Sequence, residues 1–97
     1  MNDRVKELIY RRRRQILVHS FLYYQLNTNV IDDHKFDRWS RELAELQDKY
    51  PEESKAAGYY EGFKDFDGSS GYDLPYATPE IQNAGYSVLD YHRRNKK

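Results

Sequence analysis

The chain lacks cysteine altogether across its 97 residues. Without thiols it can form neither a disulfide bond nor a thiolate metal site. The histidines His19, His34 and His92 are scattered along the sequence. None of them forms a helical i, i+4 pair with another metal ligand, and we therefore expect no bound metal ion.

Long apolar runs and an excess of one charge are also absent. The longest aliphatic run, Ile16-Leu17-Val18, is too short for the core of a signal peptide or for a membrane span. We therefore expect a cytoplasmic protein without membrane contact. The 16 Lys and Arg balance the 16 Asp and Glu, giving a net charge of zero, and a neutral total argues against long-range steering onto nucleic acid.

Tyrosine, by contrast, is abundant, with ten among 97 residues. A tyrosine buries its ring while keeping its hydroxyl at a wet edge. A chain of this length forms one domain with one modest core. Such a tyrosine-rich core suits interfaces, so we expect a homo-oligomer or a protein partner.

Helical spacing dominates the first half of the chain. One helix is expected over residues 3–26 and a second over residues 33–50, which ends before Pro51. The asparagine-rich stretch 27–29 is typical of a turn. Apolar residues of the second helix recur at steps of three and four, the spacing of a helix packed along another helix: Phe36, Trp39, Leu43, Leu46 and Tyr50.

The second half predicts a third helix after an irregular arm. Residues 53–77 are rich in glycine and tyrosine and give no firm helical pattern. Thr78 and Pro79 are a favourable cap and first residue for a helix over residues 78–93. We therefore predict an all-α fold: a helical hairpin and a C-terminal helix in a single domain, with the arm between them.

Four consecutive arginines, Arg11 to Arg14, point in four directions if they are helical. Arg12 falls between Ile9 and Ile16 on the apolar face, and we expect it to pair with an acid or a phosphate. Basic residues fill both ends of the chain, 1–14 and 92–97. These ends would form a positive patch if the last helix returned beside the start of the first. Nucleic-acid binding is then expected to be weak at most and independent of sequence.

Aromatic and acidic side chains meet where the first two helices join. Asp33, Phe36 and Asp37 share one face of the second helix, and Tyr23 and Tyr24 end the first. Aromatic planes and carboxylates suit a cationic ring and ribose hydroxyls. The alternative is structural: Asp32 or Asp33 caps the second helix and Asp37 complements its positive end. Tyr23, Phe36 and Trp39 then belong to the core.

The same residues carry a resemblance that covers about residues 9–52. Tyr23-Tyr24, Asp33-x-x-Phe36-Asp37, Glu42-Leu43-x-x-Leu46 and Pro51 follow one another without a gap. This pattern resembles the N-terminal helical domain (domain Ia) of NAD-dependent DNA ligases, which grips the nicotinamide mononucleotide (NMN) half of NAD. The resemblance implies that the ligand contacts are Tyr23, Tyr24, Asp33, Phe36 and Asp37. The ligases have tyrosine where this chain has Phe36, which keeps the stacking and loses a phenol hydrogen bond.

We identify no group of catalytic residues next to this expected ligand-binding site. Lys64-x-x-Asp67-Gly68 differs in spacing from the Lys-x-Asp-Gly nucleophile motif of ligases. We therefore expect no enzyme, but a non-catalytic binding or accessory module with NAD or NMN as its ligand. Small stand-alone relatives would place it in a phage, and hence in the host cytoplasm. The alternatives are an accessory subunit that completes an NAD-dependent ligase in trans and a weak nucleic-acid-binding protein.

Overall fold

The computed structural model describes residues 1–28, 30–68 and 74–95, and within these residues every regular element is a helix. The helices are α1 (Asp3–Tyr24), α2 (Asp33–Lys49), α3 (Pro51–Ala56), α4 (Tyr60–Phe63) and α5 (Pro79–Asn95). The predicted all-α class, the hairpin and the C-terminal helix are confirmed.

Local signals fix the two long helices of the hairpin. The Asn2 side chain accepts hydrogen bonds from the backbone N–H groups of Arg4 and Val5, which caps α1. Asp32 caps α2 by accepting from the Lys35 N–H at 2.7 Å. Between the helices, Asn27 turns the chain with a positive φ of 50°, a conformation that asparagine tolerates.

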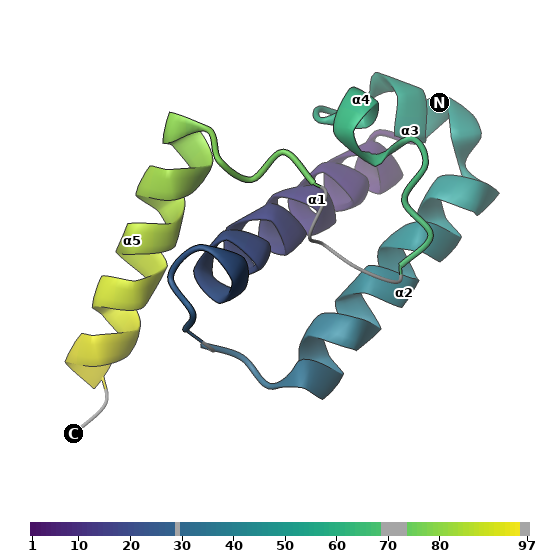
Figure 1. The fold of residues 1–97 in the computed structure, drawn as a ribbon. Coiled ribbons are helices and arrows are strands. Elements are labelled where there is room, and N and C mark those ends of the chain that lie inside the picture. Colours follow the sequence, from purple (N-terminus) through teal and green to yellow (C-terminus); the bar gives the residue numbers. More distant parts are fainter. Residues whose placement is uncertain (29, 69–73, 96–97) are drawn as a thin grey trace.

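Helix α1 lies at the centre of the molecule (Figure 1), with α2 packed on one side and α5 on the other. Helices α3 and α4 lie at the end of the hairpin where α1 begins and α2 ends. As the apolar stretch of α1 predicts, its second half is covered on several sides. The buried residues there are Ile16, Leu17, Val18, Ser20, Phe21 and Leu22.

Helix α5 approaches α1 closely at Gly85. A Cβ atom on this glycine would lie 2.5 Å from the Phe21 ring, so a larger residue would push the helices apart. Because Gly85 is the point of approach, the buried face of α5 runs through Ile81, Gly85 and Leu89. Apolar spacing alone would also place Tyr91 on the inner face, but Tyr91 is 72 % exposed.

The arm is more ordered than the sequence indicates. Its first part contains the short helices α3 and α4, joined through Tyr59 in the left-handed conformation. The Tyr59 ring stacks on Tyr10 at 5.7 Å, a contact with α1 that sequence spacing does not reveal. Residues 69–73 of the arm lie outside the described residues. Beyond them, Tyr76 is buried and stacks on Tyr24.

A fully buried arginine ties these elements together, and it is Arg13 rather than Arg12. Its guanidinium donates to Gln47 of α2 at 2.9 Å and to the Ser54 hydroxyl of α3 at 2.7 Å. It also donates to the backbone carbonyls of Ala57 and Gly58, both at 3.1 Å. One side chain thereby joins α1, α2, α3 and the turn that follows.

Arg13 remains charged in this site. Burial lowers the pKa of its guanidinium to about 10, which is still well above neutral pH. All four acceptors just described are neutral oxygens. The charge is therefore stabilised by dipoles, which must be held in place because a buried charge without hydrogen bonds is very costly.

We expect Arg13→Ala to lower the free energy of unfolding by about 3–5 kcal/mol, because it leaves buried carbonyl and side-chain oxygens without donors. Urea unfolding followed by circular dichroism measures the change. Arg11→Ala is the matched control: Arg11 is exposed and pairs with Glu7 at the surface, so its loss costs about 0.5 kcal/mol or less. Equal effects of the two variants would contradict the role of Arg13.

Candidate functional site

The order of contacts along the hairpin shows which residues share its open end. Arg12 faces Glu42, and further along α1 His19 faces Trp39. The two helices are therefore antiparallel, and the end of α1 lies at the same end of the hairpin as the start of α2. This junction, formed by residues 23–24 and 33–37, contains the five residues predicted to contact a ligand.

The aromatic half of the junction is a pair of tyrosines at the end of α1. The rings of Tyr23 and Tyr24 meet edge to face at 4.8 Å. Tyr23 is 48 % exposed, whereas Tyr24 is half-buried and stacks on Tyr76 at 6.0 Å. Tyr24 thus holds Tyr23 at the surface, where its ring is accessible to a ligand.

The acidic half of the junction lies in the first turns of α2. Asp33 and Asp37 are exposed. Asp37 accepts from Arg41 at 2.6 Å in an i, i+4 ion pair. Phe36 is half-buried and packs against the core. The structure thus brings Tyr23 and Tyr24 into contact and places both carboxylates at the surface, but Phe36 serves mainly to anchor α2.

The capping alternative is partly correct. Asp32, and not Asp33, is the residue that caps α2. Asp33 is therefore not needed as the cap, and as the first residue of α2 it complements the positive end of the helix dipole. The assignment to the core does not hold for Tyr23, which is largely exposed, whereas its neighbour Tyr24 packs against the core.

A cluster around Trp39 joins the two helices next to the junction. The half-buried indole lies 5.5 Å from the His19 ring. The Lys35 ammonium lies 5.4 Å and the Arg12 guanidinium 5.8 Å from its centre, distances that suit cation–π contacts. Trp39 is therefore packed as expected, but by polar neighbours rather than in the middle of the apolar core.

His19 is uncharged in this cluster at neutral pH. Burial, together with the nearby charge of Lys35, lowers the pKa of the imidazole to about 4. A second cation here would oppose the two that already face Trp39. The neutral imidazole is therefore part of the packing between α1 and α2.

The four arginines do not form a basic patch. Arg11 pairs with Glu7, Arg12 with Glu42 and Arg14 with Glu80, while Arg13 is buried. The expected pairing of Arg12 with an acid is confirmed.

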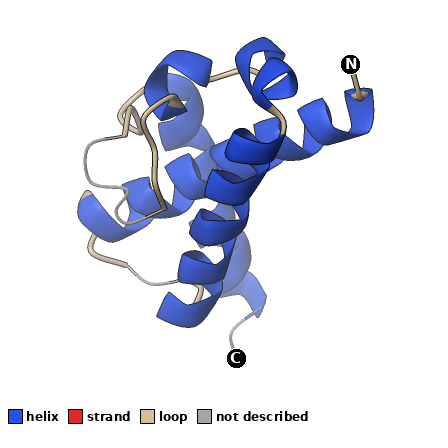
Figure 2. Cartoon of the chain, turned by 90° about the vertical axis from the view of Figure 1, so that its right-hand side faces the viewer, coloured by secondary structure: helices blue, strands red, loops and turns tan. Residues whose placement is uncertain are grey.

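The two basic ends of the chain also lie apart. Glu80 at the start of α5 contacts Arg14, and Gly85 contacts Phe21, so α5 runs in the same direction as the second half of α1. Its basic end therefore points away from residues 1–14, as Figures 1 and 2 show. The condition for a positive patch, that the last helix returns beside the start of the first, is therefore not met in the described residues; Lys96 and Lys97 lie outside them.

In residues 1–28, 30–68 and 74–95, no three His, Asp or Glu side chains are grouped so that they could hold a metal ion. No helix in the same part of the chain is both long and apolar enough to cross a membrane.

Together, the fold and the junction define a small helical-hairpin domain with an aromatic and acidic end. Residues 2–57 match a protein-family model described as "DNA ligase-like, N-terminal NAD+-binding domain". This segment extends from the cap of α1 to Ala57, a hydrogen-bond acceptor of Arg13. No solved structure gives a significant match.

Curated relatives point to the same family. The DNA ligase of Thermotoga maritima is 33 % identical over 101 residues, covering 96 % of this chain and 14 % of the ligase. The DNA ligases of Thermotoga neapolitana and of Thermoanaerobacter sp. strain X514 are 46 % and 44 % identical, over 50 % and 52 % of this chain and 7 % of each ligase. The chain belongs to the family of DNA ligase-like N-terminal domains, and it spans only a small part of the length of these relatives.

We expect stability to decrease as pH falls, because the unfolded chain protonates His19 near pH 6.5 and the folded chain only near pH 4. Between pH 7 and pH 5 the free energy of unfolding should fall by about 2 kcal/mol. Urea unfolding at pH 7, 6 and 5 measures this slope. His19→Gln should flatten it and the control His34→Gln, an exposed site, should not. An unchanged slope in His19→Gln would assign the dependence to other groups.

Proposed function

We propose that this chain is a non-catalytic module that binds the nicotinamide mononucleotide half of NAD at the junction of α1 and α2. The observation that carries the proposal is that exposed aromatic and acidic side chains lie at the same end of the hairpin. Tyr23 is half exposed at the same end of the hairpin as the exposed carboxylates of Asp33 and Asp37. Membership of a family described as NAD+-binding supports the proposal.

The chemistry of the ligand suits these groups. The oxidised nicotinamide ring is cationic, so it favours an aromatic face with carboxylates nearby. In this proposal the ring lies against Tyr23. Asp33 and Asp37 accept hydrogen bonds from the ribose hydroxyls, as carboxylates do in other dinucleotide sites.

The ion pair of Asp37 is compatible with this role. Arg41 uses only part of the acceptor capacity of the carboxylate, which can take up to about four hydrogen bonds. The pair is at the surface, where such contacts contribute little to stability. Arg41 therefore orients Asp37 without blocking it.

Phe36 argues for weak binding. Its ring is half-buried against the core and has no hydroxyl to donate to the ligand. The ligand then keeps the contacts of Tyr23 and the carboxylates but loses one hydrogen bond, worth about 1 kcal/mol. We expect affinity in the millimolar range.

Titration of the ¹⁵N-labelled chain with NMN should shift the amide signals of the junction more than all others. The expected centres of the shifts are Tyr23, Tyr24, Asp33, Phe36 and Asp37. Asp37→Asn should weaken binding about tenfold, equivalent to about 1.4 kcal/mol. The matched control is Asp90→Asn, because Asp90 also forms an i, i+4 pair with an exposed arginine, Arg94.

Tyrosine variants provide a second matched pair. Tyr23→Ala should reduce the NMN-induced shifts several-fold, whereas Tyr91→Ala, also at an exposed tyrosine in the last turns of a long helix, should leave them unchanged. If 10 mM NMN produced no localised shifts, or if the Asp37 and Asp90 variants behaved alike, the junction would have only a structural role.

A second candidate function is that of an accessory subunit that supplies this grip to a separate adenylation domain. The favouring observation is that residues 2–57 match a family model described as a DNA ligase-like, N-terminal NAD+-binding domain. The test is NAD-dependent self-adenylylation of an isolated ligase adenylation domain. Under this candidate, wild-type chain should raise the rate at least about tenfold and Asp37→Asn should not. Equal rates with and without the chain would exclude the accessory role for that ligase.

A further inference from the structure

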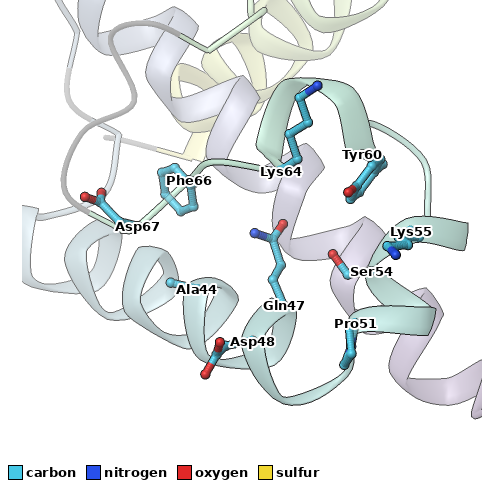
Figure 3. A pocket seen from close by; sticks show the side chains of 10 residues that line it. All are labelled: Ala44, Gln47, Asp48, Pro51, Ser54, Lys55, Tyr60, Lys64, Phe66 and Asp67. Atoms are coloured by element: carbon cyan, nitrogen blue, oxygen red, sulfur yellow. The ribbon is translucent and has the colours of Figure 1, made fainter.

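A polar pocket lies at the other end of the hairpin from the junction. It has a volume of about 360 Å³ and is formed by the last turns of α2, by α3 and α4, and by the segment that follows α4 (Figure 3). Because Gln47 in its wall bonds to Arg13 in the first half of α1, the pocket is separated from Tyr23 by about three helical turns. It is therefore a different site from the junction.

Polar groups from three elements converge on this space. Figure 3 shows the amide of Gln47, the hydroxyl of Ser54 and the phenol of Tyr60 directed toward one another across the pocket. The ring of Phe66 forms another part of the wall. A few convergent polar groups next to aromatic rings are typical of small-molecule sites.

The buried charge of Arg13 lies directly behind two of these groups. The guanidinium donates to the Gln47 side-chain oxygen at 2.9 Å and to the Ser54 hydroxyl oxygen at 2.7 Å. Its carbon lies 6.0 Å from the centre of the Tyr60 ring. The pocket is thus one hydrogen bond away from a buried cation whose four acceptors are all neutral oxygens.

Ser54 transmits this charge to the pocket. Its oxygen accepts from Arg13, so its own O–H remains as a donor. A hydroxyl that accepts from a cation becomes a stronger donor, because hydrogen bonds in a chain polarise one another. The group that best satisfies this donor is an anionic oxygen.

Charges at the rim do not reverse this preference. Lys55 and Lys64 are balanced in number by Asp48 and Asp67. In Figure 3 both carboxylates point outward, away from the Gln47 amide. The charges of the lining residues therefore sum to zero, and the buried Arg13 behind the wall adds a positive charge.

We propose that this pocket is a second binding site, which takes a small molecule with an anionic oxygen group and an aromatic body, such as an aryl carboxylate or an aryl phosphate. The anion accepts from Ser54 and lies close to the Arg13 charge. The aromatic body packs against Phe66 and Tyr60. Carboxylates and phosphates share the required chemistry, and the experiment distinguishes them.

The test uses probes that differ in charge and not in ring. Benzoate, phenyl phosphate and neutral benzamide are titrated separately into the ¹⁵N-labelled chain at constant ionic strength. Benzoate or phenyl phosphate should shift the amide signals of Ser54, Lys55, Tyr60 and Phe66. The affinity of at least one of these anions should be at least about tenfold higher than that of benzamide. The stronger of the two anions identifies the preferred group. Tyr23 and Asp33 should not shift, which separates this site from the junction.

Two variants test the mechanism. Ser54→Ala should abolish the preference for anions, and Ser40→Ala should retain it, because Ser40 is also buried but bonds to a backbone carbonyl of α2. Lys55→Gln removes an exposed charge at the rim, and folding should not depend on it. It should weaken anion binding less than threefold if Arg13 dominates. Equal binding of benzoate and benzamide, or no shifts at 20 mM of any probe, would overturn the proposal.

Discussion

The four hydrogen bonds of Arg13 are the constraint on which the rest of the structure depends. A domain of this size has a small core, and its stability is a narrow balance. One buried guanidinium replaces apolar contacts by fixing Gln47, Ser54 and the carbonyls after α3 around a single point. Because an arginine presents donors in a rigid fork, these partners must take defined positions. The end of α2, helix α3 and the following turn are thereby placed relative to α1.

This arrangement leaves the opposite end of the hairpin free for another role. At the Arg13 end, side chains and carbonyls are used to hold helices together. At the junction, Tyr23, Asp33 and Asp37 are exposed, and the contacts that hold the helices there come from their neighbours Tyr24 and Phe36. Because these three side chains contribute little to packing, their identity can be set by ligand binding, as the proposed site requires.

The hairpin could be predicted from the sequence because its information is local: apolar spacing, an aspartate cap and a proline after α2. The buried arginine could not be chosen from Ile9 and Ile16 alone, since Arg12 and Arg13 both lie within a turn of each. Adding Leu17 and Ser20, which are also buried, centres the face on Arg13. The contact face of α5 and the helices of the arm depend on long-range contacts, Gly85 with Phe21 and Tyr59 with Tyr10. The position of the five junction residues at one end of the hairpin could be predicted from the sequence, but the exposure of each side chain could not.

The two halves of the junction are held by different parts of the fold. Phe21 and Leu22 pack against Gly85 of α5, and this contact fixes the end of α1 that carries Tyr23. The carboxylates belong to α2, whose position next to α1 depends on Trp39, His19 and Arg12. The α1–α2 packing therefore contributes to the distance between the aromatic and the acidic half. A change at His19 or Trp39 should alter a ligand site at the junction without touching the ligand, whereas a change at Gly85 should act first on the tyrosines.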